Sequence, residues 1–527
     1  NAEGIFTGGG NTFELVNQLY KNDIIDTVKN DVENGTAYLG TSAGSNICGV
    51  SMMNTNDMPS KNSYSFDVNM AGLGASYTKV WKEKTALFGS LGYTNLSTLF
   101  SLVPQNRSWD KAPNGTSATF GFRHLTEQGG LYKSYLQYSN GNIALSFQTN
   151  ESETPNSRFS NTTKNLFWNN SYRGYLGDNW KLLLTGSLSF DEDEDQFNDN
   201  KSLEKDWLGQ SRITLSRRFG KTKLRLGGEM QVFKNDFTTN QELTTMNNTF
   251  TSFYVESNFK FSNTIALRAG LRGERASIIK KSSIMPRLSL SYRFSNKSLF
   301  SLAYGKFYQT PQEEFLRKTT LIEFESATHY IANFQWKTKQ RLFRIEAYIK
   351  DYDNLIKQDS SFILNNSGTG FSKGIDVFWR DEKSIENLTY WLSYSYIDAK
   401  RFYRDFPIEA SPTFVSDHNL SLVANFKLTP LIRTGFAYNY ASGRPYFNPN
   451  SDIYLDDRTI DYHNLNFSAS YLTSIFGNFS VVYLSLKNPF SIKQIFGYKY
   501  SDYGTQRSPI LPSTNWSFFA GISISVE

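Results

Sequence analysis

The strongest constraint on this chain is an alternation of apolar and polar residues with a period of two, which begins near residue 61 and continues to the C-terminus. In the segment 287–294, Leu288, Leu290 and Tyr292 fall on one face of an extended chain, and the residues between them are polar. Successive side chains of a strand point to opposite faces, so the pattern predicts strands with one apolar and one polar face. The polar faces of such segments carry Arg225, Arg268, Arg272, Arg287 and Arg293.

The connections between these segments distinguish a soluble sandwich from a membrane barrel. Short turns recur at 82–83, 128–130, 176–178, 219–220, 262–263, 295–296, 338–339, 381–383, 429–430 and 475–477. Longer polar segments lie between them, at 102–115, 139–162, 191–205, 309–321 and 448–461. Regular alternation of short and long connections is typical of periplasmic turns and extracellular loops. The sequence therefore predicts an all-β fold, a large antiparallel transmembrane β-barrel with apolar residues toward lipid and charges toward the lumen.

Composition agrees with a barrel and excludes other classes. Aromatic residues make up 16% of the chain and the mean hydropathy is −0.46. No apolar run approaches the length of about 18 residues that a membrane-spanning helix needs. Trp168, Trp180 and Trp516 stand at strand ends, as expected of an interfacial girdle. The net charge of +6 is dispersed, so we expect no nucleic-acid partner. The single cysteine, Cys48, allows no disulfide and no Cys-based metal site.

The turns also give a strand count. Ten short turns imply ten hairpins, and the segment 515–526 adds one strand, for a total of about 21. An antiparallel barrel closes with an even number, and large plugged transporters have about 22 strands. We therefore expect a barrel that lacks its first strand.

Several motifs occur in an order that resembles the barrel of TonB-dependent receptors. They are Met285 to Tyr292, Tyr348 to Ile356, Asn366 to Asp376, Ala441 to Tyr446 and Asn488 to Phe490. The resemblance implies a bacterial outer-membrane receptor that takes up a scarce nutrient, such as a metal chelate, a vitamin or an oligosaccharide, with the TonB complex as partner. The sequence shows no plug domain and no TonB box, so energised transport is not expected of this chain as it stands. A passive pore or an adhesin is the alternative.

The first sixty residues have a different texture, with short strands, a glycine turn and an apolar periodicity typical of a helix. Residues 40–44 form the pattern Gly-Thr-Ser-Ala-Gly, a nucleophile elbow that exposes a serine hydroxyl at a sharp turn. With the glycines at 8–10 and the segment 54–59, this part resembles peptidase E, a cytoplasmic α-aspartyl dipeptidase. The resemblance implies Ser42 as nucleophile and Asp57 as triad acid, with Gly9, Gly10 and Ala43 in the oxyanion region.

A serine nucleophile needs a base to accept its proton. The four histidines, His124, His329, His418 and His463, all fall in predicted barrel segments. We therefore expect no enzyme activity, with hydrolysis of Asp-Xaa dipeptides at Ser42 as the alternative. The two textures predict a peptidase-like fragment over 1–60 joined to a barrel over 61–527. Because the halves belong to different compartments, a truncated or chimeric chain is the expected explanation, and the absence of a leader suggests a missing N-terminus.

Two charged features have a functional and a structural interpretation. The acidic run 191–195 could bind Ca²⁺, but its spacing matches no known loop, and we interpret it as a solvated loop tip, with no metal and no cofactor expected. The five arginines named above could line the route of an anionic substrate. A charged inner face is also the ordinary state of a large barrel.

Overall fold

The computed structural model describes residues 4–7, 37–40, 61–81, 84–147, 157–177, 179–240, 242–359, 361–501 and 503–526. In these residues strands dominate, and the two α-helices, α4 (Ser97–Leu102) and α5 (Glu313–Leu316), are short. None of the helices described here has the length and the apolar character needed to cross a membrane.

The strands follow one another around a ring. The first half comprises β3 (Ser63–Asn69), β4 (Gly72–Trp81), β5 (Thr85–Asn95), β6 (Ser108–Leu125), β7 (Leu131–Phe147), β8 (Ser157–Leu176), β9 (Trp180–Phe197), β10 (Asn200–Phe219), β11 (Thr222–Thr239), β12 (Glu242–Lys260) and β13 (Ile265–Ala276). The second half comprises β14 (Lys281–Arg293), β15 (Ser298–Gln309), β16 (Glu325–Lys337), β17 (Arg341–Gln358), β18 (Leu364–Asp381), β19 (Leu388–Phe402), β20 (His418–Lys427), β21 (Ile432–Ala441), β22 (Tyr462–Ile475), β23 (Asn478–Lys487) and β26 (Ser517–Val526).

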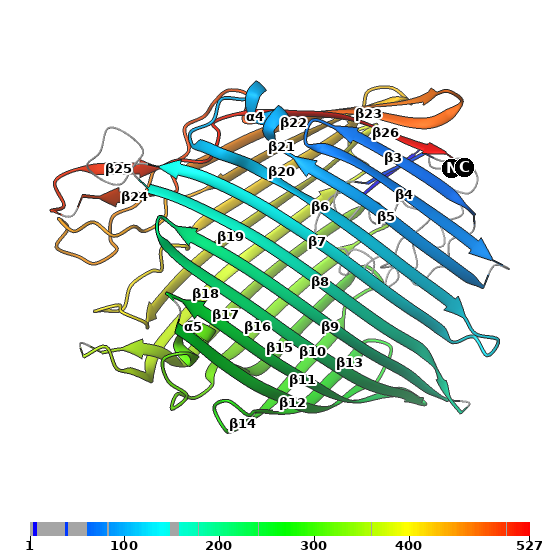
Figure 1. Ribbon diagram of the computed structural model, residues 1–527. Helices are drawn as coiled ribbons and strands as arrows, with labels where there is room; N and C mark the ends of the chain where they lie inside the picture. Colours follow the sequence, from blue (N-terminus) through cyan, green and yellow to red (C-terminus); the bar gives the residue numbers. More distant parts are fainter. Residues whose placement is uncertain are drawn as a thin grey trace.

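These 22 strands form one closed antiparallel barrel (Figure 1). The ring closes where β26 pairs with β3, from Gly521 opposite Asn69 to Val526 opposite Tyr64. Closure satisfies the backbone hydrogen-bonding groups of every strand without leaving a free edge, which is what lets strands cross a bilayer. The predicted large antiparallel barrel is confirmed.

The expectation of about 21 strands with the first one missing is wrong. The additional strand is β3, which precedes the first predicted hairpin and reaches β4 through the two residues Met70 and Ala71. The strand number was predicted from short turns at the periplasmic end, such as the one before β5. The turn between β3 and β4 is also short but lies at the extracellular end, where long loops were expected, so nothing in the sequence indicated a separate hairpin there.

The side chains alternate between the two faces as predicted. Leu288, Leu290 and Tyr292 of β14 lie on the outer face and are exposed. Phe253 on the same face of β12 is 73% exposed. A broad apolar outer surface of this kind is stable only against lipid.

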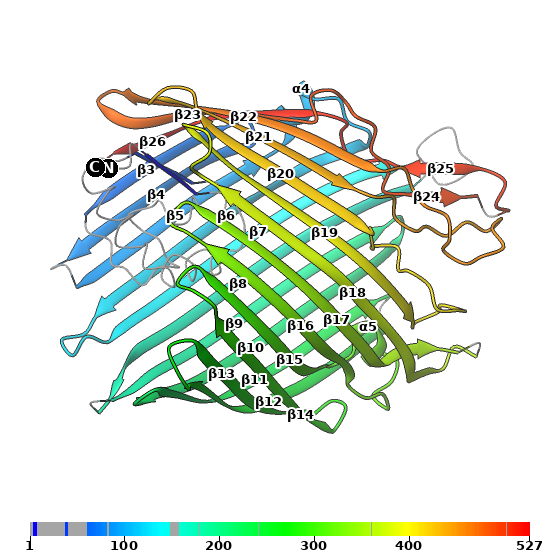
Figure 2. The ribbon, with the colours of Figure 1, turned by 180° about the vertical axis from the view of Figure 1, so that it is seen from behind.

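The two ends of the barrel differ. One carries short turns, and the other carries longer connections that include α5 and the small hairpin of β24 (Gly497–Tyr500) and β25 (Arg507–Ile510), as the two views in Figures 1 and 2 show. Short turns mark the periplasmic end and long loops the extracellular end.

Three of the expected long loops are shorter than predicted, because strands extend into them. Residues 191–205, expected as a loop, lie almost entirely in β9 and β10, which join at Asn198 and Asp199. Asn198 has a φ of +51°, the left-handed conformation that a tight hairpin needs. Strands β6 and β7 likewise extend into the segments 102–115 and 139–162. Apart from Gln309, the last residue of β15, segments 309–321 and 448–461 do lie outside the barrel strands, and the first carries α5.

The N-terminal part contributes β1 (Gly4–Thr7) and β2 (Ala37–Gly40), which pair in parallel from Gly4 opposite Ala37 to Thr7 opposite Gly40. They agree with the short strands that the sequence predicts in the first sixty residues. A parallel pair requires a crossover connection, which agrees with the α/β texture of the sequence. The helix expected between them lies outside the described residues.

Candidate functional site

The inner wall of the barrel carries the predicted arginines. Arg225 lies on β11, Arg268 and Arg272 on β13, and Arg287 and Arg293 on β14. The strand register places these side chains on the face opposite the exposed leucines, since Arg268 pairs with Ser289 and Arg272 with Met285.

One of these arginines is committed to an internal ion-pair network. Nη2 of Arg272 donates to Glu229 of β11 at 2.7 Å, and the same carboxylate accepts from Nε of Arg212 at 2.7 Å. Arg272 also pairs with Glu274. The side chain of Glu229 is only 9% exposed and that of Arg272 19%, whereas Arg212 is 52% exposed, so the network bridges β10 to β13 around a buried carboxylate. Such groups hold the wall together rather than wait for a ligand.

The other arginines are more accessible. Arg225 and Arg268 share Glu256, at 3.4 and 3.9 Å, and Arg268 also donates to Asn258 at 2.7 Å. Arg287 lies over the ring of Phe307, with 4.7 Å from the guanidinium carbon to the centroid. Arg293 is exposed. These four could contact a solute in the lumen, whereas Arg272 could do so only by giving up its carboxylates.

Toward the extracellular end the wall becomes acidic. In β9, Asp191 pairs in register with Asp206 of β10, and Asp193 pairs with Glu204. The alternation puts these four carboxylates and Asp195 on the inner face. The run 191–195 is therefore part of a strand wall, and its interpretation as a loop tip is wrong.

The outer face at the same level shows where the membrane ends. Phe190 and Trp207 pair on the outer face with ring centroids 6.5 Å apart, as in an interfacial girdle. One step further along, Glu192 pairs with Lys164 at 2.8 Å and with Lys205 at 3.2 Å. Charged pairs do not face hydrocarbon, so the strands have left the bilayer at this point.

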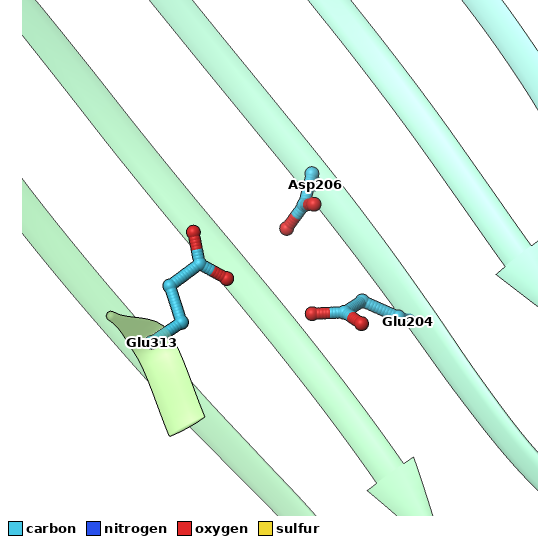
Figure 3. Close-up of side chains that lie close together, drawn as sticks. All are labelled: Glu204, Asp206 and Glu313. Atoms are coloured by element: carbon cyan, nitrogen blue, oxygen red, sulfur yellow. The ribbon is translucent and has the colours of Figure 1, made fainter. Parts of the chain in front are cut away.

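One more carboxylate, that of Glu313, reaches this acidic wall from the loop that follows β15. Carboxylate oxygens of Glu204, Asp206 and Glu313 lie within 4.8 Å of one another, with Glu313 contributed by α5 (Figure 3). The fully buried Asn235 of β11 donates from Nδ2 to Glu204 at 2.6 Å and to Asp206 at 2.7 Å. These oxygens are of the kind that hard cations prefer.

The positive charge of Arg317 already balances part of the negative charge of this cluster. Its guanidinium pairs with Glu204, lies 3.5 Å from Glu313 and donates to Oδ1 of Asn235 at 3.2 Å. It also lies over the ring of Phe237, 4.3 Å from the centroid. The arrangement therefore anchors the α5 loop to the barrel wall, with an arginine as the cation that contacts two of the three carboxylates.

The cluster still carries more negative than positive charge, and this shows in the carboxyl groups. Burial raises the pKa of Asp206, and the charges of Glu204 and Asp191 raise it further, against a hydrogen bond from Asn235. Burial and the charge of Asp206 also raise the pKa of Glu313. This part of the wall holds protons more tightly than free carboxylates do.

Apolar packing fixes the same loop. Phe315 and Leu316 of α5 are buried in a cluster with Met246 and Ala276, from β12 and β13, and with Ile356 of β17. The loop thus attaches to the barrel by a hydrophobic contact and by the Arg317 ion pair. Sequence reasoning missed Arg317, Asn235 and Glu313, because no local pattern links a loop arginine to carboxylates on distant strands.

The peptidase-like candidates Ser42, Asp57, Gly9, Gly10 and Ala43 lie outside the described residues. Strand β2 ends at Gly40, two positions before Ser42 in the sequence. The four histidines lie in barrel strands, where three of them share a hydrogen bond with a hydroxyl group: His124 with Thr85, His418 with Tyr394 and His463 with Tyr438.

Comparison with known proteins gives two separate similarities. Residues 85–488 match the family described as TonB dependent receptor-like, beta-barrel, and residues 1–74 match peptidase family S51. Peptidase E of Shewanella denitrificans is 54% identical over 59 residues, which are 11% of this chain and 25% of that protein. Peptidase E of Haemophilus influenzae is 55% identical over 58 residues, 11% of this chain and 27% of that protein. The chain thus spans about a quarter of the length of the curated relatives it matches.

Solved structures resemble the barrel. The siderophore receptor PiuA from Acinetobacter baumannii superposes with a TM-score of 0.71 at 10% identity, covering 88% of this chain and 81% of that one. The ferric-catecholate import receptor Fiu from Escherichia coli K12 gives 0.67 at 11% identity, covering 88% and 81%. At these identities the likeness concerns the fold.

Proposed function

The chain belongs to the TonB-dependent receptor-like β-barrel family, and we propose from this premise that its barrel takes up a scarce nutrient across the bacterial outer membrane. The observation that carries the proposal is the closed 22-strand barrel with a charged inner wall and an apolar outer face. A barrel of this size encloses a lumen wide enough to pass a solute. The receptor barrel itself is not an enzyme, and the TonB complex is the proposed energy-coupling partner.

The nutrient is a metal chelate, a vitamin or an oligosaccharide. The acidic wall formed by Asp191, Asp193, Glu204 and Asp206 attracts cations and repels anions at the extracellular mouth. Most of the predicted arginines are shared with carboxylates or a ring, so the wall supports a cationic or neutral solute better than an anionic one. PiuA and Fiu are described as siderophore and ferric-catecholate receptors, but the substrate proposed here rests on the wall of this chain.

The test is uptake by cells that produce the full chain and lack their own receptors. We expect saturable accumulation of a radiolabelled ferric chelate, cobalamin or maltooligosaccharide once the barrel is supplied with a plug domain and a TonB box, neither of which was recognised in this chain. This accumulation should stop when tonB is deleted. The paired variants Glu204→Gln and Asp206→Asn should weaken the uptake of a cationic chelate and spare that of a neutral one. Accumulation that rises linearly with concentration and ignores tonB would support the passive pore instead, and failure with all three probes would contradict the proposal.

A second activity is proposed only as the alternative for the N-terminal part, on the match of residues 1–74 to peptidase family S51. Hydrolysis of an Asp-Xaa dipeptide by the purified chain, lost in Ser42→Ala, would support it. We expect this assay to show no hydrolysis, because the four histidines lie in barrel strands. We also propose that the two parts come from different proteins joined near residue 60, and sequencing reads that run continuously through codons 50–70 of the source genome would contradict this.

A further inference from the structure

The outer face of β10 to β13 carries an apolar groove of about 500 Å³, lined by side chains that include Ile213, Leu226, Phe253, Val255 and Leu271. These four strands lie side by side in the barrel (Figure 1). The volume falls in the range of about 300–1,000 Å³ typical of small-molecule sites. On this face the surrounding solvent is hydrocarbon.

One glycine, Gly273, opens the hollow, whereas the ring of Phe253 covers a second, Gly228. Gly228 and Gly273 flank Phe253 in the strand register, on the same outward face. A Cβ atom at Gly273 would meet nothing nearer than a backbone oxygen at 4.0 Å, so the space above it is open. The ring of Phe253 forms a wall beside that space.

A cation stands at one end of the groove. Arg217 follows Leu215, a lining residue, by two positions on the same face of β10, which places their Cα atoms about 7 Å apart. Its guanidinium lies 5.8 Å from the ring centroid of Trp180 and 5.0 Å from that of Phe219. Among the described residues no carboxylate pairs with it. Strand β10 ends at Phe219, so Arg217 lies at the periplasmic boundary of the bilayer.

We propose that this groove binds one phospholipid of the periplasmic leaflet, with the phosphate on Arg217 and an acyl chain over Leu215 toward Gly273. Arg217 has no carboxylate partner among the described residues and is held by aromatic rings at the bilayer boundary, which suits an anion, and the adjoining apolar groove suits a chain of methylene groups. A phospholipid supplies both at the right spacing, and the leaflet it comes from is set by the position of Arg217. The proposal goes beyond nutrient uptake and does not depend on it.

The experiment measures lipid retention by native mass spectrometry on the full chain in detergent, after exchange into phosphatidylglycerol or phosphatidylcholine. We expect one retained phosphatidylglycerol, with at least a fivefold preference over phosphatidylcholine. Arg217→Gln should abolish the preference, and Gly273→Leu should fill the groove and lower the retention of both lipids. Folding of each variant is verified by its heat-modifiable migration on a gel.

Two matched controls separate the site from general lipid contact. Gly89 of β5 also lies on the outer face, between Tyr77 and Phe120, with no atom within 4 Å of a Cβ, so Gly89→Leu adds the same side chain elsewhere. Arg293→Gln removes an arginine near a short turn on the inner face. Both should retain the lipid as the wild type does.

Three results would overturn the proposal. Equal loss of lipid in Gly89→Leu and Gly273→Leu would show an unspecific lipid annulus. Displacement of the bound lipid by millimolar inorganic phosphate alone would show an anion site that does not recognise an acyl chain. A dimer in light scattering that disappears in Gly273→Leu would assign the groove to a second copy of the chain.

Discussion

Nη2 of Arg272 on β13 donates to Oε2 of Glu229 on β11 at 2.7 Å, across the intervening strand β12. The pair joins strands that are not hydrogen-bonded to each other. Its carboxylate also accepts from Arg212, so one glutamate fixes side chains from both directions along the wall.

Replacing this glutamate should destabilise the barrel. Glu229→Gln removes the shared charge and leaves two guanidinium groups with a weaker acceptor, and one of them, Arg272, is only 19% exposed. We expect the free energy of unfolding to fall by about 1–3 kcal/mol, measured by urea titration of tryptophan fluorescence in detergent. The control is Glu256→Gln, whose arginine partners are 43% and 62% exposed and whose loss should cost about 0–1 kcal/mol. Equal losses in the two variants would contradict the special role of Glu229.

The acidic cluster at the extracellular end should respond to pH. The folded-state pKa of Asp206 is raised, so the folded protein binds a proton that the unfolded chain has already lost. The penalty of the charged form therefore develops as the pH rises above the ordinary value of 3.8 and through the raised pKa. We expect Asp206→Asn to raise the urea midpoint at pH 7.5 relative to the wild type, and to have a smaller effect at pH 4. A difference that grows on acidification would contradict this assignment.

The charge of Asp381, at the periplasmic end, should stabilise the folded protein, the opposite of the effect expected for Asp206. Although burial raises its pKa, hydrogen bonds from Ser384 and Lys383 and the charge of Arg341 outweigh burial and lower the pKa from 3.8 to about 2. Its contribution to stability is complete above pH 3.8 and is lost as the pH falls through 2. The urea midpoint of Asp381→Asn should lie below that of the wild type at pH 7, and the two should converge near pH 2. Parallel midpoints over this range would show that the charge does not matter.

Closure of the ring should depend on β3. Phe66 pairs with Ile524 of β26 on one side and with Ala75 of β4 on the other. Phe66→Pro removes a backbone hydrogen-bond donor in the middle of this closing strand, a position in which proline is not tolerated because the strand is paired on both sides. We expect loss of the heat-modifiable folded band, while Phe66→Leu, which keeps the apolar outer face, should fold normally. A folded band in Phe66→Pro would mean that the barrel closes without this pairing.

Most of the barrel could be predicted from the sequence, because the signals that specify it, side-chain alternation and turn residues, are local. The period of two assigns Leu288 to lipid and Arg287 to the lumen without knowledge of any partner strand. Turn residues such as Gly220 and Gly477, with φ values of +56° and +78°, mark hairpins by their own backbone needs. Alternation and turns together specify an antiparallel barrel of nearly the right size.

The tertiary structure decided what depends on distant partners. The run 191–195 became a strand because β10 offers a hydrogen-bonding edge over its whole length, against the low strand propensity of aspartate. Arg317 meets Glu204 across a separation of 113 residues, which no local pattern encodes. Strand β3 alternates in the sequence, but its tight turn to β4 kept it out of the strand count, and its role in closing the ring depends on its pairing with β26. Side-chain periodicity thus determined which face each residue takes, whereas strand extension, ring closure and the mounting of the α5 loop depend on which backbone groups and charges the closed ring brings together.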